Sequence, residues 1–295
     1  MPDIPFWNKC NNKCVMCTNL PEFAAQEAAL YGLKSQIKKL ESYLKGLGPV
    51  YLKNNDKADF LSLTGGEPTL HPDFFRLLAY FKRRLPGVSI TLLSNGRRFA
   101  DKDFTRRFLK MAGSRLTVAV PLHGASSRVH DKVAGVRGAF RETVGGLENL
   151  LAGPEGVFLE IRLVLHRLNI KEFSKILLFL RENLPFPGRY RVVVIHYEIE
   201  GMSLKNHKSL ALRLSDSARV INAAASLIET FPDLRLYHFP LCLIKNKLRS
   251  RCWITLPAED RIYTKKCDGC KARKECLGLM LEYYKEFGDA ELKTL

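Results

Sequence analysis

The hydrophobic positions along the chain follow two different periods. Leucine and isoleucine recur every three or four residues from Leu30 to Leu47, which predicts an amphipathic helix. From residue 58 onwards, short apolar runs alternate with longer amphipathic stretches. The apolar runs predict six buried strands, which are ADFLSL, VSITLLSNG, LTVAVPLHG, VFLEIRLVL, YRVVVIHYE and LRLYHF.

The amphipathic stretches between these runs predict helices. They are DFFRLLAYFKRRL, DKDFTRRFLKMAG, GAFRETVGGLENLL, KEFSKILLFLREN and SDSARVINAAASLIETF, the last with Ser215 as its N-cap. Strands that alternate with helices predict a parallel sheet, because parallel neighbours need crossover connections. IPFW, just before Cys10, predicts a short extra strand. Because either count falls short of the eight strands of a closed barrel, we expect an α/β fold, a partial (β/α)6 barrel that binds its ligand at the carboxyl ends of the strands.

Length and cysteine usage narrow the class of protein. A chain of 295 residues with 46% hydrophobic composition can bury a large core. Because no apolar run reaches the roughly 18 residues of a membrane helix and no signal peptide is evident, we expect a cytoplasmic protein without a membrane partner. Eight cysteines lie in two groups, with none between residues 18 and 241, which in a reducing compartment indicates metal ligation. Residues 241–295 lose the strand-helix rhythm, so we predict one domain over 1–240 and a small cysteine-rich module over 241–295.

The net charge of +17 invites an anionic partner such as a nucleic acid. The basic residues are spread over most predicted helices, so a solvated surface is the favoured alternative. Residues 242–276 hold ten Lys or Arg against four Asp or Glu, in the segment that carries the late cysteines. Four-thiolate iron-sulfur clusters carry negative charge, and this local excess could balance it.

The stretch CNNKCVMC places Cys10, Cys14 and Cys17 in one loop. Three thiolates can bind three irons of a [4Fe-4S] cluster and leave the fourth iron open for chemistry. A structural zinc site would need a fourth cysteine or a histidine, and the first histidine is His71. The alternatives are a zinc site and cysteines that bind no metal.

A second motif, TGGEP, lies where the first predicted strand ends. Gly65 and Gly66 would let a ligand approach the backbone closely, and Glu67 could accept hydrogen bonds from an ammonium group. A tight turn is the alternative interpretation of the same residues. The ligand-binding interpretation is favoured because the motif follows the three-cysteine loop after a single predicted helix.

Together these residues resemble the radical S-adenosylmethionine (SAM) superfamily. The resemblance implies that the fourth iron binds the amino and carboxylate groups of SAM, and that an electron from the cluster cleaves SAM to a 5′-deoxyadenosyl radical. It makes Cys10, Cys14 and Cys17 the catalytic cluster ligands of a radical SAM barrel over residues 1–240. It also implies an external electron donor such as flavodoxin or ferredoxin.

The resemblance also assigns residues that bind SAM, namely Met16, Gly65, Gly66, Glu67, Ser94, Asn95 and Arg162. Glu67 and the glycine backbone would hold the ammonium group, and Met16 would lie against adenine. Ser94 and Asn95 would reach the ribose or the carboxylate, or merely close a strand as a polar turn. Arg162 would bind the carboxylate, or would pair with Glu160 or Glu198.

The late cysteines predict a second metal site. Four of them suffice for a fully ligated cluster, and our choice is Cys242, Cys267, Cys270 and Cys276. Cys252 would then be a buried spare, a hydrogen donor or a participant in cluster assembly. A four-cysteine zinc site is the alternative. The superfamily resemblance favours one auxiliary [4Fe-4S] cluster in a module of the Twitch or SPASM type.

Several stretches resemble more closely the radical SAM maturases of the His-Xaa-Ser system, the HxsC type. They are CNNKCVMC, LTGGEP, LLSNGRRFAD, VPLHGASSRVHDKVAGVRGAFRETVGGLENL, EIRLVLHRLN, LYHFPLCLI and YTKKCDGCKARKEC. The resemblance implies a peptide maturase that forms a side-chain cross-link or another oxidative modification in a ribosomally made peptide, together with a paired radical SAM partner.

Two departures from that family affect the expected substrate. Only nine residues precede Cys10, so we expect the recognition function of a longer leading segment to be absent, and EIEGMSLKNHKSL matches the family only loosely. The alternatives are a radical SAM enzyme that acts on RNA or a nucleotide-derived small molecule, and a zinc-stabilised basic binding protein without radical chemistry.

Overall fold

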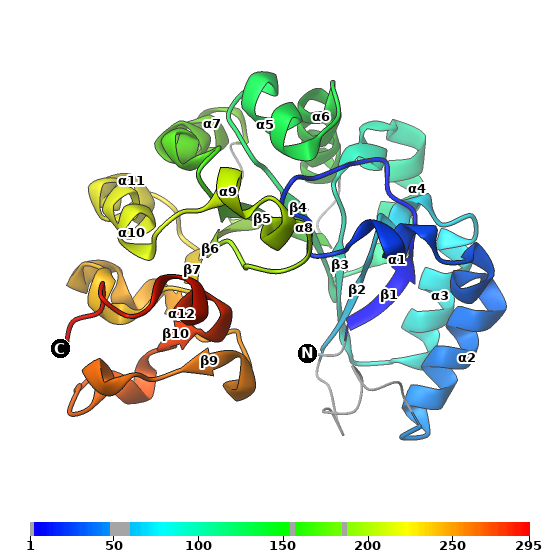
Figure 1. The fold of residues 1–295 in the computed structure, drawn as a ribbon. Coiled ribbons are helices and arrows are strands. Elements are labelled where there is room, and N and C mark those ends of the chain that lie inside the picture. The colour runs from blue at the N-terminus through cyan, green and yellow to red at the C-terminus, as the bar shows by residue number, and fades with distance from the viewer. Residues whose placement is uncertain (1–2, 48–59, 154–156, 185–187) are drawn as a thin grey trace. The chain divides into compact units, whose positions relative to one another are not determined.

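The computed structural model describes residues 3–47, 60–153, 157–184 and 188–295 (Figure 1). Eight strands form one sheet in which the order of the strands follows the chain. They are β1 (Asp3–Trp7), β2 (Phe60–Gly65), β3 (Ser89–Leu93), β4 (Leu116–Pro121), β5 (Val157–Leu165), β6 (Tyr190–His196), β7 (Leu234–Tyr237) and β8 (Cys252–Trp253). The pairings of β1 with β2, β2 with β3, β3 with β4, β6 with β7, and β7 with β8 are all parallel. The predicted α/β fold with a parallel sheet is confirmed.

All six predicted strands are present, and the extra strand predicted at IPFW is β1. The first two residues of the predicted ADFLSL strand, 58 and 59, lie outside the described residues. The sequence did not predict β8, which pairs with β7 through Leu236 and Cys252. A strand of two residues is too short to show a period, so the count of six or seven strands becomes eight.

Twelve α-helices lie in the described part of the chain. They are α1 (Pro21–Ala25), α2 (Leu33–Leu44), α3 (Phe74–Arg84), α4 (Lys102–Ala112), α5 (Ser127–Ala134), α6 (Ala139–Ala152), α7 (Phe173–Asn183), α8 (Gly201–Lys205), α9 (His207–Leu210), α10 (Leu214–Ala223), α11 (Ala225–Glu229) and α12 (Leu281–Phe287). Two short strands, β9 (Arg261–Ile262) and β10 (Leu279–Met280), form a separate antiparallel pair. None of these helices combines the length and the apolar character that a membrane span requires.

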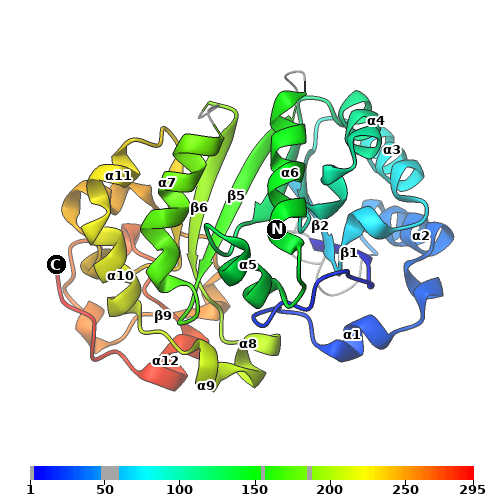
Figure 2. The ribbon, with the colours of Figure 1, turned by 90° about the horizontal axis from the view of Figure 1, so that it is seen from above.

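The chain divides into two compact units. The first contains Met1–Lys13, Asn19–Pro121 and Val136–Glu160. Within it, helices α2, α3 and α4 lie alongside the first strands (Figures 1 and 2). Helix α4 shows why the pattern folds as predicted: the Asp101 carboxylate caps its first turn, and Phe104 and Phe108 bury the same face one turn apart.

Helix α2 is shorter than the leucine pattern predicted. The helix begins after Gly32 and ends at Leu44, so Leu30 and Leu47 lie outside it and are 52% and 73% exposed. Gln36 is buried instead, because its side-chain amide donates to the carbonyl oxygens of Pro5 and Phe6 at 2.8 Å each. A polar residue on the inner face of the helix thus anchors the end of β1.

The second unit contains Cys14–Thr18, Leu122–Gly135 and Ile161–Leu295. Here the predicted Ser215 N-cap is wrong, because α10 begins at Leu214 and has no side-chain cap. The Leu214 N–H donates to Tyr283 Oη at 2.9 Å, and the Ser215 N–H donates to Glu291 Oε2 at 2.6 Å. Groups about 70 residues further along the chain therefore satisfy the first turn of the helix.

Candidate functional site

The end of β2 packs directly against the loop that follows β1. The Gly66 N–H donates to the carbonyl oxygen of Trp7 at 2.6 Å. A Cβ at Gly65, where φ is +117°, would overlap that same oxygen, and a Cβ at Gly66 would lie 2.7 Å from the carbonyl carbon of Lys9. The two glycines are therefore required where this turn meets the loop that carries Cys10.

Glu67 links two strand ends from a fully buried position. Its Oε1 accepts hydrogen bonds from Thr69 N (3.1 Å), Thr69 Oγ1 (2.5 Å) and Ser94 Oγ (2.8 Å), and its Oε2 accepts one from Asn95 N (2.6 Å). Burial raises the pKa of the Glu67 carboxyl, and the hydrogen bonds act in the opposite direction. The carboxyl end of β2 is thus joined to the residues that follow β3.

Asn95 extends this network to Cys10. Its Nδ2 donates to Asn11 Oδ1 at 2.6 Å and lies 3.9 Å from Cys10 Sγ. The Asn12 N–H also donates to Cys10 Sγ, at 3.3 Å. Of the predicted site residues, the first unit therefore brings together Cys10, Gly65, Gly66, Glu67, Ser94 and Asn95. Donors that face a sulfur stabilise its thiolate form, the form that binds iron.

Sequence reasoning missed Arg97, which holds the same loop. Its Nη1 donates to the Asn11 carbonyl oxygen at 2.6 Å and to Asn12 Oδ1 at 2.8 Å, while its Nε pairs with Glu142 Oε2 at 2.6 Å. The only signal was its place two residues after Asn95. Its neighbour Arg98 stacks over the Phe104 ring instead, so the sequence alone did not distinguish the two arginines.

Cys14, Met16 and Cys17 lie in a short segment of the second unit. The Cys17 N–H donates to the Cys14 carbonyl oxygen at 3.2 Å, which closes a tight turn between the two cysteines. The carbonyl oxygens of residues 15–17 accept hydrogen bonds from α8 and from the residue that links it to α9. These contacts come from the stretch EIEGMSLKNHKSL, for which the sequence suggested no role in the cluster loop.

Arg162, on β5, lies among charged groups that follow β6 and β7. Burial raises the pKa of Glu198 and lowers that of His238 to about 4, and the Arg162 charge lowers both pKa values. His238 Nε2 lies 3.5 Å from Glu198 Oε1. Burial, and then the Glu198 charge, raise the pKa of Glu200 to about 7. Of the two acidic partners considered for Arg162, the structure places Glu198 within its electrostatic reach.

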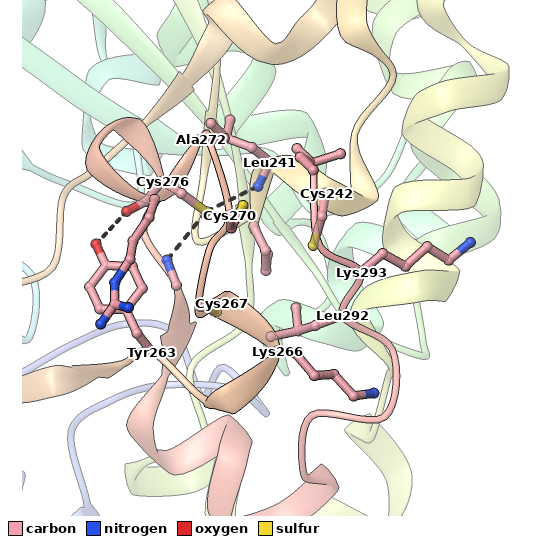
Figure 3. Close-up of a pocket in the computed structure, with 14 residues that line it drawn as sticks. Leu241, Cys242, Tyr263, Lys266, Cys267, Cys270, Ala272, Cys276, Leu292 and Lys293 are labelled. Atoms are coloured by element: carbon pink, nitrogen blue, oxygen red, sulfur yellow. Dashed lines mark hydrogen bonds between the residues drawn. The ribbon is translucent and has the colours of Figure 1, made fainter.

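Four of the late cysteines line one pocket in the second unit (Figure 3). They are Cys242, Cys267, Cys270 and Cys276, the same four that the sequence selected. Cys276 Sγ accepts hydrogen bonds from the N–H groups of Leu241 (3.3 Å) and Gly278 (3.4 Å). Across the described residues, no three His, Cys, Asp or Glu side chains form a group that could hold a single metal ion.

The chemistry of this pocket fits a four-thiolate iron-sulfur cluster. Lys266, Arg273 and Lys293 also line it, and their positive charges complement the negative charge of such a cluster. Cys252 is absent from the lining. Burial raises the pKa of its thiol to about 12, and Cys276 adds to the shift.

A family model described as the radical SAM superfamily matches residues 4–180, which is more than half of the chain. The chain belongs to the radical SAM superfamily. The match includes the three-cysteine loop, the GGEP motif and the residues after β3.

Known radical SAM proteins resemble parts of this chain. Mycofactocin maturase MftC of Mycobacterium tuberculosis is 33% identical over 117 residues, which is 39% of this chain and 28% of MftC. Fe-coproporphyrin III synthase of Methanosarcina barkeri is 30% identical over 182 residues, 60% of this chain and 40% of the synthase. The chain thus spans less than half of the length of these relatives.

The fold is also similar to that of a solved radical SAM protein. Streptococcus suis SuiB, in its crystal structure bound to the precursor peptide SuiA, superposes with a TM-score of 0.57 at 18% sequence identity. The similarity covers 79% of this chain and 47% of SuiB. At this sequence identity, the similarity supports the fold of this chain and nothing more specific.

Proposed function

We propose that this protein reductively cleaves SAM and uses the resulting radical to modify a ribosomally made peptide. The observation that carries the proposal is the pocket of four cysteines in a radical SAM chain that also has the three-cysteine loop. Oxidative modification of a peptide needs an acceptor for the electron that remains after hydrogen abstraction. An auxiliary cluster within residues 241–295 would provide one.

The residues of the cluster loop have separate roles in this proposal. Cys10, Cys14 and Cys17 hold a [4Fe-4S] cluster, which when bound supplies the electron that cleaves SAM. Asn95 and the Asn12 N–H favour the thiolate of Cys10 through the contacts given above. Arg97 fixes the backbone of the same loop.

Most of the residues assigned to SAM binding lie at the ends of the strands. The backbone at Gly65 and Gly66 would bind the SAM ammonium group, and Met16 would contact the adenine. Glu67 holds Ser94 and the Asn95 backbone in place, so the turn after β3 is preorganised for the ribose or the carboxylate. Arg162 supplies a positive charge for the carboxylate, although Glu198 competes for that charge.

The auxiliary cluster is assigned to Cys242, Cys267, Cys270 and Cys276. Two N–H groups donate to Cys276 Sγ, and three basic side chains line the pocket, so the anionic form of this site is stabilised. Cys252 does not line this pocket and stays outside the ligand set. An external flavodoxin or ferredoxin would supply the electron for the cluster of the loop.

The peptide substrate is inferred from relatives and from sequence resemblance. MftC is a maturase, and SuiB is solved with a precursor peptide bound. The stretches that resemble the HxsC-type maturases favour a precursor with His-Xaa-Ser repeats and a paired radical SAM partner. The second candidate is RNA or a nucleotide-derived small molecule, which the net charge of +17 would suit.

The test is anaerobic incubation of the reconstituted protein with SAM, a strong reductant and a synthetic peptide that contains His-Xaa-Ser repeats. We expect the peptide to lose the mass of a pair of hydrogen atoms, and a variant with Cys10, Cys14 and Cys17 all replaced by Ala to leave it unchanged. SAM cleavage with no mass change in the peptide, alone or with the paired partner, would contradict the peptide assignment. Binding to RNA that weakens steeply with salt would then favour the second candidate.

A further inference from the structure

One short stretch after β6 satisfies three successive carbonyl groups of the cluster loop. The Met202 N–H donates to the Cys17 oxygen at 2.7 Å, Ser203 Oγ to the Met16 oxygen at 3.1 Å, and Asn206 Nδ2 to the Val15 oxygen at 2.8 Å. Each donor thus binds a different carbonyl group in the segment from Cys14 to Cys17. A displacement of this segment by one residue would break all three hydrogen bonds.

Close packing at Gly201 reinforces these bonds. Its φ is +54°, and a Cβ there would overlap the Thr18 carbonyl oxygen and lie 2.7 Å from the Cys17 oxygen. The atoms that would be overlapped belong to the backbone of the cluster loop, so they cannot rotate away as a flexible side chain could. Gly201 therefore brings α8 to within direct contact of the loop immediately after Cys17.

The donors themselves are firmly held. Ser203 is 1% exposed, and the Asn206 N–H donates to the Met202 carbonyl oxygen at 2.8 Å. Leu210, at the end of α9, is completely buried, and its carbonyl oxygen accepts from Arg167 N at 3.0 Å. The stretch from Gly201 to Leu210 is thus fixed to the body of the second unit.

The opposite side of the loop has its own anchor. The Val15 N–H donates to the carbonyl oxygen of Val133, in α5, at 2.9 Å. The peptide groups around Val15 are therefore held between α5 and the linker between α8 and α9. With both sides anchored, the direction in which the neighbouring cysteine side chains leave the backbone is determined by these contacts.

We infer that the stretch Gly201–Leu210 is a positioning element that sets the places of Cys14 and Cys17 for the cluster of the loop. Gly201, Ser203 and Asn206 are its positioning residues. The inference rests on the proposed function, because it assumes that the loop holds the cluster at which SAM is cleaved. It assigns a role to a part of the chain that resembles the HxsC-type maturases only loosely.

The test uses isosteric and conservative variants of the donors in the anaerobically reconstituted holoprotein. Asn206→Asp keeps the shape of the side chain but places an acceptor against the Val15 oxygen, and Ser203→Ala removes its donor. Ser203→Thr restores a hydroxyl group. Ser35→Ala is the matched control, because Ser35 lies outside this stretch and its Oγ also donates to a backbone carbonyl oxygen, that of Ala29 at 2.8 Å.

Three measurements are made on each variant. They are the rate at which a chelator removes iron, the change in the electron paramagnetic resonance signal of the reduced protein on addition of SAM, and hydrogen exchange of the peptide that contains residues 14–18. For the Ser203→Ala/Asn206→Asp double variant we expect at least tenfold faster iron loss, a weaker or altered response to SAM, and faster exchange. Ser35→Ala should match the parent, and Ser203→Thr should exceed Ser203→Ala in iron retention.

Three outcomes separate the failure of this inference from the failure of the proposed function. If the parent responds to SAM and the double variant responds identically, with equal iron loss, the positioning role is overturned while the proposed function stands. Faster exchange without a change in iron loss or in the SAM response would likewise overturn it, because the contacts would then be merely structural. If the parent itself shows no response to SAM, the proposed function fails and the inference fails with it.

Discussion

Acidification is expected to destabilise the fold through buried histidines at the ends of four neighbouring strands. His123, His166, His196 and His238 follow or end β4, β5, β6 and β7, and all are 5% exposed or less. Burial is the largest cause that lowers their pKa values, to about 3 for His166 and His196 and to about 4 for His238. The pKa of His123 is lowered well below its ordinary value for the same reason.

The direction of the change in stability with pH follows from the number of protons that the folded and unfolded chains bind. Each histidine has a folded-state pKa below its ordinary value of 6.5, so at mildly acidic pH the unfolded chain binds a proton that the folded chain rejects. The stability from the neutral side chain is complete above about pH 6.5 and is lost as the pH falls towards the folded-state pKa. Between about pH 7.5 and about pH 5.5, one such histidine changes the equilibrium constant of unfolding about tenfold. This lowers the free energy of unfolding by about 1 kcal/mol.

His196 isolates the effect of one histidine. Its Nδ1 lies 2.9 Å from Ser217 Oγ, and glutamine at this position is polar but does not titrate. The carboxyl groups of Glu67, Glu198 and Glu200 have raised pKa values and therefore stabilise the fold as the pH falls. A comparison of His196→Gln with the parent at both pH values removes these opposing contributions.

The assay is urea unfolding, followed by circular dichroism, of the parent and of His196→Gln at each pH. On acidification the parent should lose about 1 kcal/mol more of its free energy of unfolding than the variant does, whatever the variant loses at neutral pH. Equal losses in the two proteins would refute the reasoning, because His196 would then have the same proton affinity in the folded and unfolded states.

Four substitutions test the two proposed iron sites through the amount of iron bound or the rate at which it is lost. Gly66→Ala should lower iron bound at the loop at least tenfold, because its Cβ would meet the Lys9 backbone, and a full iron complement would contradict this. Arg97→Ala should speed iron loss from the same loop, measured with a chelator, and an unchanged rate would exclude its role. Cys276→Ser should reduce the iron from about eight to about four per chain and keep SAM cleavage, whereas Cys252→Ala should leave both unchanged.

The strands were predictable because parallel strands are buried on both faces and therefore appear as continuous apolar runs. The ends of α10 and α2 were not, because their decisive partners are distant in sequence. Tyr283 and Glu291 satisfy the first turn of α10, which made the local Ser215 cap unnecessary. Gln36 faces inwards on α2 only because the carbonyl groups at the end of β1 lie opposite it.

The candidate site was likewise predictable only in part. The sequence placed Cys10, Glu67 and Asn95 near one another, since the carboxyl ends of neighbouring parallel strands share an edge. It did not single out Arg97 or Asn206, whose side chains are of types common on any protein surface. Each became recognisable only when folding brought a backbone carbonyl group of the cluster loop to its donor atom.

The most direct test of the account is SAM cleavage by the reconstituted protein and by a variant in which Cys10, Cys14 and Cys17 are all Ala. Both are prepared without oxygen, reduced strongly, and analysed for iron and for 5′-deoxyadenosine. We predict about eight irons and 5′-deoxyadenosine for the parent, and about four irons with no 5′-deoxyadenosine for the variant. Formation of 5′-deoxyadenosine by the triple variant would contradict the account.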